Sequence, residues 1–327
     1  MILLWAMVLG AGDLEKLREQ VARSVVAIEV EREADPEGLT GTGAVSAHRD
    51  YFNRPKGPVS GVIYEADGFI LTSRFNISGT IRKNGLRVTL WDGRRVDAEL
   101  LGTDEQRDIA LLKIAEQGLP VLPRADFKTL NPGTFVALVG RSPDLSHPTL
   151  NCGILSAMNR MDKAAVQTDA EMNYGNAGGA LVTLKGELIG VGCNIKPDTV
   201  WGQSGGVGFA CKTSEIDALL ERLKKGEKIA AEKRPWLGIR PGEGNPDVDG
   251  LQIAEVLPGS PADKVGIKKD DVLVEFAGQE ITDFESFREA LAGKKIGDEV
   301  SLKIKRKKAE DYEDHEFKVT LEGKAEP

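Results

Sequence analysis

Short apolar or alternating stretches recur along the first two thirds of the chain, and turn residues separate them. They span residues 26–30, 60–64, 69–72, 86–90, 96–101, 109–114, 135–139, 153–158, 165–167, 181–184, 188–193 and 207–211. Asp67-Gly68 and Asp92-Gly93 are typical turn dipeptides, and Asn131-Pro132-Gly133 begins the second half of the series. Closely spaced short strands are the pattern of all-β barrels. The sequence therefore predicts two β-barrels with a cleft between them.

Two segments beside these strands have the spacing of helices instead. Leu14, Leu17 and Val21 recur at helical intervals ahead of the first strand. After the last strand, one apolar face is formed by Ile216, Leu219, Leu220 and Leu223. Ser214 and Asp217 resemble a capping box at the start of that second helix, and Lys225-Gly226 ends it.

The last third of the chain has its own pattern, which predicts a separate α+β domain. A helix with Phe284, Phe287 and Leu291 on one face is followed by two alternating strands, at 300–304 and 317–321. Residues 225–234 are charged and lack an apolar stripe, which is typical of a linker. We expect domains at 13–224 and 235–323, with a linker at 225–234 and a tail at 324–327.

Composition restricts the kind of protein more than it identifies the function. The 327 residues suffice for two or three domains of about 100–200 residues each. The chain is 41% hydrophobic and 29% charged, as globular proteins are. The net charge of −8 argues against general affinity for nucleic acid. No long apolar run that would span a membrane is present, and we expect no cofactor.

The first residues of the chain have two interpretations. Ile2 to Leu9 form an apolar run that is too short to cross a bilayer. With the small residues Gly10 to Gly12 after it, the run suits a signal peptide at residues 1–12, although a basic start is missing. The alternative is a buried N-terminal segment. A signal peptide would place the protein in the periplasm or outside the cell.

The three cysteines, Cys152, Cys193 and Cys211, do not have metal-ligand spacing. We therefore expect no metal site. Cysteines buried as free thiols behave as small apolar residues, and this is one expectation for the three side chains.

A glycine-rich loop carries the chemistry on which the functional analysis depends. It reads Asn173-Tyr174-Gly175-Asn176-Ala177-Gly178-Gly179-Ala180-Leu181. Its glycines allow a tight backbone that can aim several N–H groups at one point. The residue that would carry a nucleophile in such a loop is Ala177, whose methyl group cannot attack a carbonyl.

Three segments together resemble the HtrA/DegP family of trypsin-fold serine proteases. They are the loop with its preceding Gln167-Thr168-Asp169-Ala170, the stretch Asp104 to Ile114, and the stretch Asp67 to Ile77. The resemblance implies a chymotrypsin-like double β-barrel. It places the family's triad Ser, Asp and His on Ala177, Asp108 and Phe75 respectively. It also places Cys193 and Cys211 on neighbouring strands, so a disulfide between them is an alternative to free thiols.

This match predicts a chain that is not an enzyme, since two of the three catalytic groups are absent. The three histidines, His48, His147 and His315, lie outside the matching segments. Triad residues act as a unit, so little catalysis survives the loss of one. The backbone N–H groups of Gly175 and Ala177 would remain as an oxyanion hole. The cleft would then either hold an extended peptide without cutting it or collapse.

The segment from Pro235 to Gly323 resembles a PDZ domain of the bacterial, permuted kind. The specific runs are Val256 to Ala262, Gly266 to Leu273 and Gly278 to Ile281. The family's carboxylate-binding loop falls on Trp236, Leu237, Gly238 and Ile239. A tight turn containing glycine can present N–H groups to a peptide's terminal carboxylate, while a strand edge pairs with the peptide. A domain that serves only as a spacer is the alternative.

The main functional hypothesis is a catalytically inactive HtrA-like protein that binds polypeptide C-termini or unfolded protein, for quality control or as a scaffold. It would act as a homo-oligomer, such as the family's trimers, or in a mixed oligomer with an active relative. The first alternative is a serine-type endopeptidase with a non-standard catalytic group, for which Cys152 and Cys193 are the nearest thiols. A structural subunit without a ligand is the second alternative.

Overall fold

The computed structural model describes residues 11–33, 58–141, 147–173, 175–193, 206–231, 233–242, 248–308 and 311–325. The chain divides into two compact units, Met1–Ala230 and Ala231–Pro327. Most of the possible signal peptide at residues 1–12 lies outside the described residues, whereas Ala11 and Gly12 already belong to the first helix.

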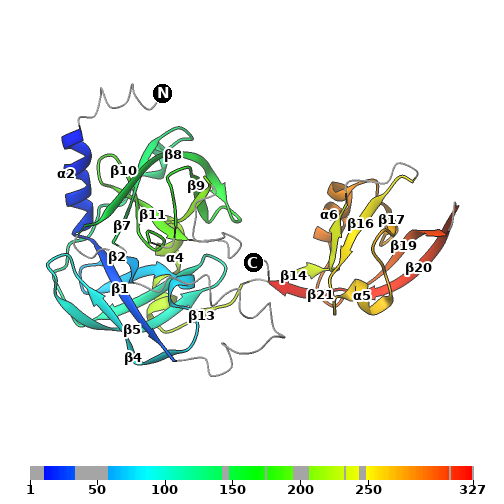
Figure 1. Cartoon of the computed structure of the whole chain (residues 1–327), viewed down its shortest axis with the longest axis horizontal. Helices are drawn as coiled ribbons and strands as arrows, with labels where there is room; N and C mark the ends of the chain where they lie inside the picture. The colour runs from blue at the N-terminus through cyan, green and yellow to red at the C-terminus, as the bar shows by residue number, and fades with distance from the viewer. Residues whose placement is uncertain are drawn as a thin grey trace. The chain divides into compact units, whose positions relative to one another are not determined.

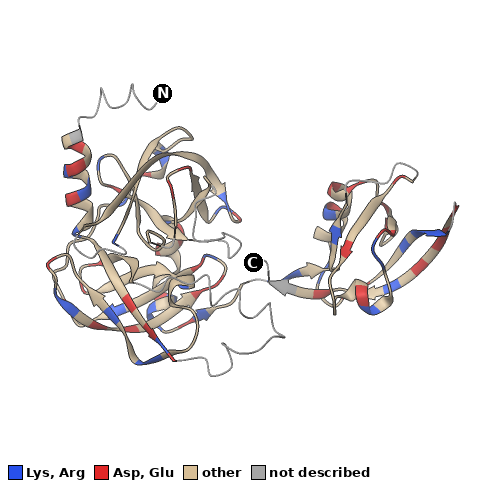
Figure 2. Ribbon diagram, viewed as in Figure 1, with Lys and Arg blue, Asp and Glu red and all other residues tan. Residues whose placement is uncertain are grey.

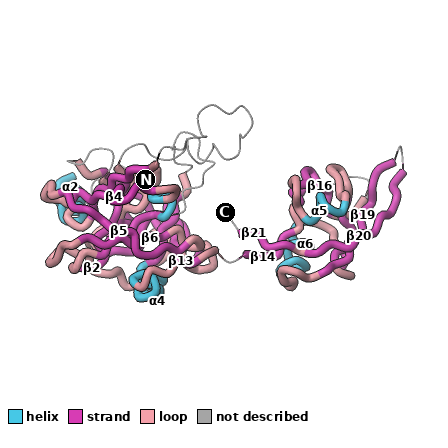
Figure 3. The backbone as a smooth tube through the Cα atoms, turned by 90° about the horizontal axis from the view of Figure 1, so that it is seen from below, coloured by secondary structure: helices cyan, strands magenta, loops and turns pink. Residues whose placement is uncertain are grey.

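The first barrel of unit 1 is a ring of six strands. Their order is β5–β4–β1–β2–β3–β6, and pairing between β5 and β6 closes the ring. The strands are β1 (Val25–Arg32), β2 (Val59–Glu65), β3 (Phe69–Ser73), β4 (Ile81–Thr89), β5 (Arg95–Asp104) and β6 (Ile109–Ile114). A short strand, β13 (Lys228–Ile229), adds to β5 in parallel. Figure 3 labels both among the strands of unit 1. The hydrophobic side chains of β2 and β6 are fully buried: those on one face of each strand belong to the core of this barrel, and those on the other face pack with residues of the second barrel and the helices.

The second barrel is also closed, in the order β10–β11–β12–β9–β8–β7. Its strands are β7 (Phe135–Gly140), β8 (Thr149–Arg160), β9 (Ala165–Thr168), β10 (Ala180–Thr183), β11 (Leu188–Cys193) and β12 (Gly208–Lys212). Both rings can be followed in Figure 1. The prediction of a mostly β fold with a trypsin-like pair of barrels is therefore confirmed.

In the described part of unit 1, two helices and two 3₁₀ turns accompany the barrels. They are α2 (Ala11–Ala22), α4 (Thr213–Lys224), η1 (Arg74–Ile77) and η2 (Phe127–Thr129). The apolar face predicted for α4 is buried, including Ile216 and Leu223. Tyr64 of β2 ties this helix to the first barrel, because its hydroxyl donates to the Asp217 carboxylate. Burial raises the pKa of Tyr64, and the hydrogen bond to Asp217 raises it further.

Unit 2 is built on a sheet with the order β15–β16–β17–β19–β20, to which β18 adds beside β17. The elements are β14 (Lys233–Trp236), β15 (Ile239–Pro241), β16 (Leu251–Val256), α5 (Pro261–Val265), β17 (Val272–Phe276), β18 (Gln279–Glu280), α6 (Phe284–Ala292), β19 (Glu299–Lys308), β20 (Asp311–Thr320) and β21 (Glu322–Ala325). The buried face of α6 packs through Phe287, whose ring meets the Phe276 ring edge-on with centroids 5.3 Å apart.

The segment predicted as a linker contains secondary structure in this model. Ile229 of β13 packs against the core of unit 1, and β14 pairs with β21 within unit 2. Backbone pairing orders these residues although their side chains show no apolar stripe. The sequence pattern could not reveal this, because edge strands of two to four residues have too few positions for a periodicity.

A buried ion pair stabilises unit 2 and gives a first prediction. The Arg306 guanidinium donates to both oxygens of Asp271 at 2.7 Å, and Asp271 is only 1% exposed. Replacing Arg306 with Gln leaves that carboxylate with only the Lys268 N–H as a donor. We expect a loss of about 2 kcal/mol of stability. Native-state hydrogen exchange of the β19 amides in the full chain measures it.

Lys303→Gln on the same strand is the matched control for this prediction. Lys303 pairs with Glu275 at 2.7 Å, but both side chains are partly exposed. Its replacement should lower the stability by less than about 1 kcal/mol. Equal losses of stability in the two variants would show that burial of the Asp271 carboxylate does not increase the contribution of its ion pair to stability.

Candidate functional site

The glycine-rich loop lies in a space where only glycine fits. A Cβ atom at Gly178 would come within 3.0 Å of the Ser60 carbonyl and the Thr72 hydroxyl, and Gly178 has φ +80°. A Cβ atom at Gly179 would collide with the Val139 carbonyl. The loop therefore packs directly on β2 and β3 of the first barrel and on β7 of the second. This close approach is the physical reason for the glycine pair.

Phe75 and Asp108, two of the positions singled out from the sequence, are in contact. The Phe75 backbone N–H donates to Asp108 Oδ1 at 2.9 Å, and the Ser73 hydroxyl donates to the other oxygen. The Arg74 N–H donates to the Asp108 carbonyl at 3.0 Å. Asp108 itself has φ +53°, a conformation that its neighbours hold in place. Its carboxylate thus has a backbone N–H and a hydroxyl as donors.

Asn76 connects this pair of residues to the third position. It lies in η1 directly after Phe75 and is fully buried. Its side-chain NH₂ donates to the Ala177 carbonyl at 2.9 Å and to the Thr72 hydroxyl at 3.3 Å. Sequence reasoning missed Asn76, because an Asn beside a motif position carries no signal of its own. The structure therefore brings all three predicted positions into one region, with Asn76 as the bridge.

The two N–H groups predicted as an oxyanion hole are both hydrogen-bonded within the loop. The Gly175 N–H donates to Asn173 Oδ1 at 2.8 Å, and the Ala177 N–H donates to the Asn173 carbonyl at 2.9 Å. The Asn173 N–H in turn donates to Asn176 Oδ1 at 2.8 Å. A bound oxyanion would have to displace these internal acceptors. Their role as oxyanion donors stays a prediction.

The predicted carboxylate-binding loop of unit 2 is a tight turn between β14 and β15. Gly238 has φ +91°, and a Cβ atom there would collide with the Ser260 side chain. The Leu237 and Gly238 carbonyls accept the N–H groups of Ala262 and Leu257, at 3.0 and 2.9 Å. The N–H groups of Leu237 and Gly238 have no acceptor in the part of the chain that is described.

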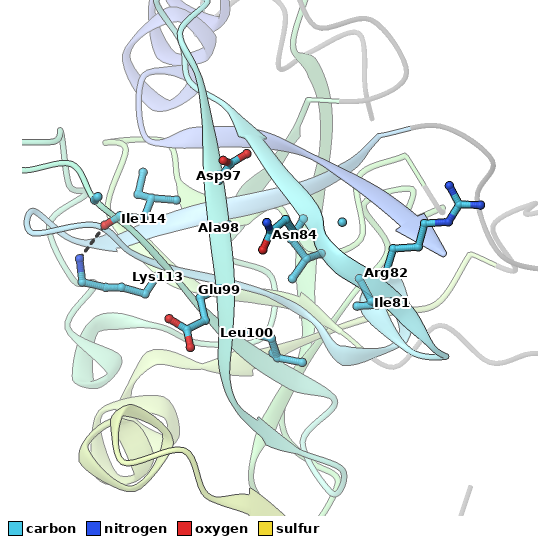
Figure 4. A pocket seen from close by; sticks show the side chains of 12 residues that line it. Ile81, Arg82, Asn84, Asp97, Ala98, Glu99, Leu100, Lys113 and Ile114 are labelled. Atoms are coloured by element: carbon cyan, nitrogen blue, oxygen red, sulfur yellow. Dashed lines mark hydrogen bonds between the residues drawn. The ribbon is translucent and has the colours of Figure 1, made fainter. Parts of the chain in front are cut away.

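A separate cavity of about 620 Å³ lies over β4, β5 and β6, and no residue of the glycine-rich loop lines it. Figure 4 shows Asn84 between the two strands β4 and β5, with Asp97 and Glu99 on β5 and Arg82 on β4. Pairing between these strands ends at Arg87 and Asp97, so the cavity opens where they diverge. Its lining has both signs of charge and includes none of the residues predicted as a site.

The cysteines are free thiols in the structure. Cys193 and Cys211 are buried, and Cys152 is exposed. Burial raises the pKa of Cys193 well above its ordinary value, and the electrostatic influence of the neighbouring Cys211 and Asp108 raises it further. Among the residues described, no three or more His, Cys, Asp or Glu side chains gather as metal ligands would.

Comparison with known families assigns both units. A model of the trypsin-like peptidase domain matches residues 59–191, and a model of the PDZ domain matches residues 235–321. The chain is a trypsin-like peptidase domain followed by a PDZ domain. Its homologues are HtrA/DegP proteases, so the resemblance seen in the sequence is confirmed at this level.

Two relatives illustrate the similarity. A protein of Haemophilus influenzae, named as a probable periplasmic serine protease do/HhoA-like, is 34% identical over 286 residues, which cover 82% of this chain and 59% of that protein. The periplasmic pH-dependent serine endoprotease DegQ of Escherichia coli is 35% identical over 264 residues, which cover 76% of this chain and 56% of DegQ. The chain thus spans less than two thirds of these relatives.

Solved structures agree with the two-domain assignment. The crystal structure of the serine endoprotease from Yersinia pestis aligns with a TM-score of 0.54 and 26% identity, over 94% of this chain and 97% of that one. A variant of the HtrA-type protease AlgW with a tripeptide aligns with a TM-score of 0.55 and 25% identity, over 96% and 98%. In the described part of the present chain, no helix is long and apolar enough to cross a membrane.

The prediction that this chain is not an enzyme is contradicted by these findings. The relatives are named serine endoproteases, and the solved structures that it resembles are a serine endoprotease and an HtrA-type protease. The prediction rested on the side chains at positions 75 and 177 alone. Catalytic groups are recognised by their geometry and roles rather than by their position in the sequence. The residue types at positions 75 and 177 therefore do not decide whether this domain is an enzyme.

The three thiols of the trypsin-like domain give a second prediction. Iodoacetamide should label Cys152 in the native protein, whereas Cys193 and Cys211 should react only after unfolding. Partial burial raises the pKa of Cys152 above 9.0, and the thiolate is the reacting form. Its labelling rate should therefore keep rising above pH 9. Peptide mapping by mass spectrometry gives the site and rate, and a disulfide between Cys193 and Cys211 would contradict the structure.

Proposed function

We propose that this chain is a periplasmic protein of the HtrA/DegP class that binds polypeptides by their C-terminal ends through its PDZ domain. The observation that carries the proposal is the pair of N–H groups at Leu237 and Gly238. Both residues are buried, and their N–H groups have no acceptor among the described residues. A buried backbone donor without a partner costs about 1–3 kcal/mol. A carboxylate can satisfy two such donors at once.

The sheet edge beside this turn supports the same proposal. β15 is the last strand on its side of the described sheet, so its outer backbone groups can pair with an added strand. The strand is short, and Pro241 at its end has no N–H. Pairing therefore extends over only Ile239 and Arg240. With so few strand bonds, the terminal carboxylate has to supply much of the affinity.

The names of the relatives support the cellular setting. Both relatives described above are called periplasmic, and the solved AlgW variant holds a tripeptide. We infer that the polypeptides are periplasmic chains with an accessible C-terminus, such as unfolded or damaged proteins. Binding to such chains is the activity expected in protein quality control. Homo-oligomers and mixed oligomers with an active relative remain compatible with this function.

Peptide binding gives a third prediction, in which the terminal carboxylate is varied. A fluorescent peptide with a free, apolar C-terminus should bind the full chain in a saturable way. Its C-terminal amide should bind at least about tenfold more weakly, because charge-assisted hydrogen bonds to the Leu237 and Gly238 N–H groups are lost. Fluorescence anisotropy measures both affinities. Equal affinities for acid and amide would contradict the proposal.

A pair of glycine variants tests the turn itself. Gly238→Ala adds a Cβ atom that collides with Ser260, and should abolish peptide binding. Gly278→Ala is the matched control, because Gly278 also has a positive φ, of +80°, but has no atom within 4 Å of the added Cβ. Both variants carry the same kind of backbone strain. Only Gly238→Ala should lose the peptide, and circular dichroism checks that both remain folded.

The second candidate function is the endopeptidase activity named in the relatives. The side chain at position 177 is a methyl group, so this activity would use another group. Cys193 suits the role poorly, because its thiol is buried and its pKa is raised. The Ser73 hydroxyl donates to the predicted catalytic carboxylate of Asp108, but Ser73 is as fully buried as Cys193, so a substrate would reach it only if the surrounding strands moved.

A degradation assay gives a fourth prediction, for this second candidate. The purified chain should degrade casein, and Ser73→Ala should lower the rate by about 10³-fold or more if Ser73 is the nucleophile. A fluorophosphonate probe should label Ser73, as located by mass spectrometry. Absence of both degradation and labelling, in protein that still binds the peptide, would rule out the endopeptidase and leave the binding function standing.

A further inference from the structure

A cluster of positive side chains surrounds a cavity of about 330 Å³ in the trypsin-like unit. Its described walls come from three distant parts of the sequence: the end of α2 with Arg23 after it, the turn between β4 and β5, and residues 141, 147 and 148. The lining residues are Arg18, Glu19, Ala22, Arg23, Trp91, Arg141, His147 and Pro148. Neither of the loops discussed above contributes to it.

The charge of this lining is opposite to that of the whole chain. Among the described lining residues, three arginines face one carboxylate, that of Glu19, so positive side chains are in excess. The chain as a whole has a net charge of −8. Figure 2 shows that α2 carries both signs of charge along its length. The described lining of the cavity thus differs in charge from the chain as a whole.

Arg18 provides the observation that points to a ligand. Its Nε atom is buried and has no hydrogen-bond partner among the described residues. Its side chain is 38% exposed, and within the described residues its guanidinium forms one ion pair, from Nη2 to Glu15 at 3.7 Å. A buried N–H group of a cation that lacks an acceptor is unfavourable. An anion in the cavity would supply that acceptor.

Arg141 holds the floor of the cavity in place. It is 5% exposed, and it donates from Nε to the Val25 carbonyl and from Nη2 to the Ala22 carbonyl, at 2.9 and 2.8 Å. The bond to Ala22 satisfies a carbonyl at the C-terminal end of α2, where the helix dipole would otherwise repel an anion, and the bond to Val25 reaches the start of β1. Burial disfavours the charge of Arg141 and lowers its pKa. An anion nearby would compensate for that loss of hydration.

Trp91 and Arg23 form the outer wall. The Arg23 guanidinium lies over the Trp91 ring, 5.5 Å from its centroid, and the ring is 45% exposed. Stacking of this kind orients a guanidinium while its N–H groups stay available at the edges. The planar guanidinium groups of Arg18 and Arg23 match the geometry of phosphate oxygens.

We propose that this cavity binds a phosphate group. The volume of about 330 Å³ leaves room for part of the molecule that carries the phosphate. The phosphate belongs either to a small soluble ester or to a lipid headgroup, and both present the same oxygens to the arginines. This inference is independent of peptide binding, because the cavity and the PDZ domain share no residue.

The test is a titration of the full chain with inorganic phosphate at constant ionic strength, with chloride as the competing ion. Binding should be saturable and should change the tryptophan fluorescence, and Trp91→Phe should abolish that change. Arg18→Gln should weaken binding about tenfold, because one charge-assisted interaction is lost. Arg87→Gln is the matched control: Arg87 is an exposed arginine of the same unit, outside the cavity, and its loss should have no effect.

Two further arms distinguish the sources of the phosphate. Glycerol phosphate should compete with inorganic phosphate whether the natural ligand is a soluble ester or a lipid. Vesicle sedimentation separates these two sources: if the chain sediments with phosphatidylglycerol vesicles but not with phosphatidylcholine vesicles, the ligand is a lipid headgroup. Vesicle binding should be lost in the Arg18→Gln variant. Phosphate binding that is absent, does not saturate, or is equal in Arg18→Gln and Arg87→Gln would overturn the proposal.

Discussion

The structure of the trypsin-like unit depends on the close contact between the glycine loop and the strands around it. Gly178 and Gly179 lie against the carbonyls of Ser60 and Val139, with no space for a Cβ atom. The Asn76 side chain then ties the Ala177 carbonyl to η1, next to the Phe75–Asp108 hydrogen bond. Because close-packed interiors do not deform gradually, this contact fixes the three positions relative to one another. The region is held together by backbone and amide groups, so it does not require the side chains that the family's triad would supply.

The same packing limits which groups can take part in chemistry or ligand binding at these positions. Ala177 is fully buried, and the Asp108 carboxylate already has two donors. Any chemistry at Asp108 must therefore use groups that are already in contact with it, of which the Ser73 hydroxyl is one. The internal bonds of Asn173 to Gly175 and Ala177 form part of the same arrangement. A ligand that took over these N–H groups would have to reorganise the loop as a whole.

Much of the fold was predictable from the sequence, but the connections within the site were not. Strand positions followed from short apolar stretches such as 109–114, because strands inside a closed barrel bury most of their side chains. The need for glycine at position 178 followed from the loop pattern. The bridge made by Asn76 and the occupation of both N–H groups by Asn173 depend on backbone direction, which residue types do not specify. The cavity beside α2 was also invisible, because Arg18, Trp91 and Arg141 are far apart in the sequence and meet only when the barrels close.

Each unit has a glycine turn with a pair of backbone N–H groups, and the two pairs differ in whether they are already hydrogen-bonded. In the trypsin-like unit, the N–H groups of Gly175 and Ala177 are already hydrogen-bonded to Asn173. An anion that bound there would have to break these bonds, so its binding free energy would be only the difference between the new hydrogen bonds and the old ones. In the PDZ unit, the N–H groups of Leu237 and Gly238 have no acceptor within the described chain, so an incoming carboxylate displaces nothing from the protein. If the PDZ turn binds a carboxylate as proposed, it would bind an anion more readily than the glycine loop does, although both turns depend on glycine. On that proposal, the affinity for a polypeptide would be set by the end of the substrate rather than by its middle.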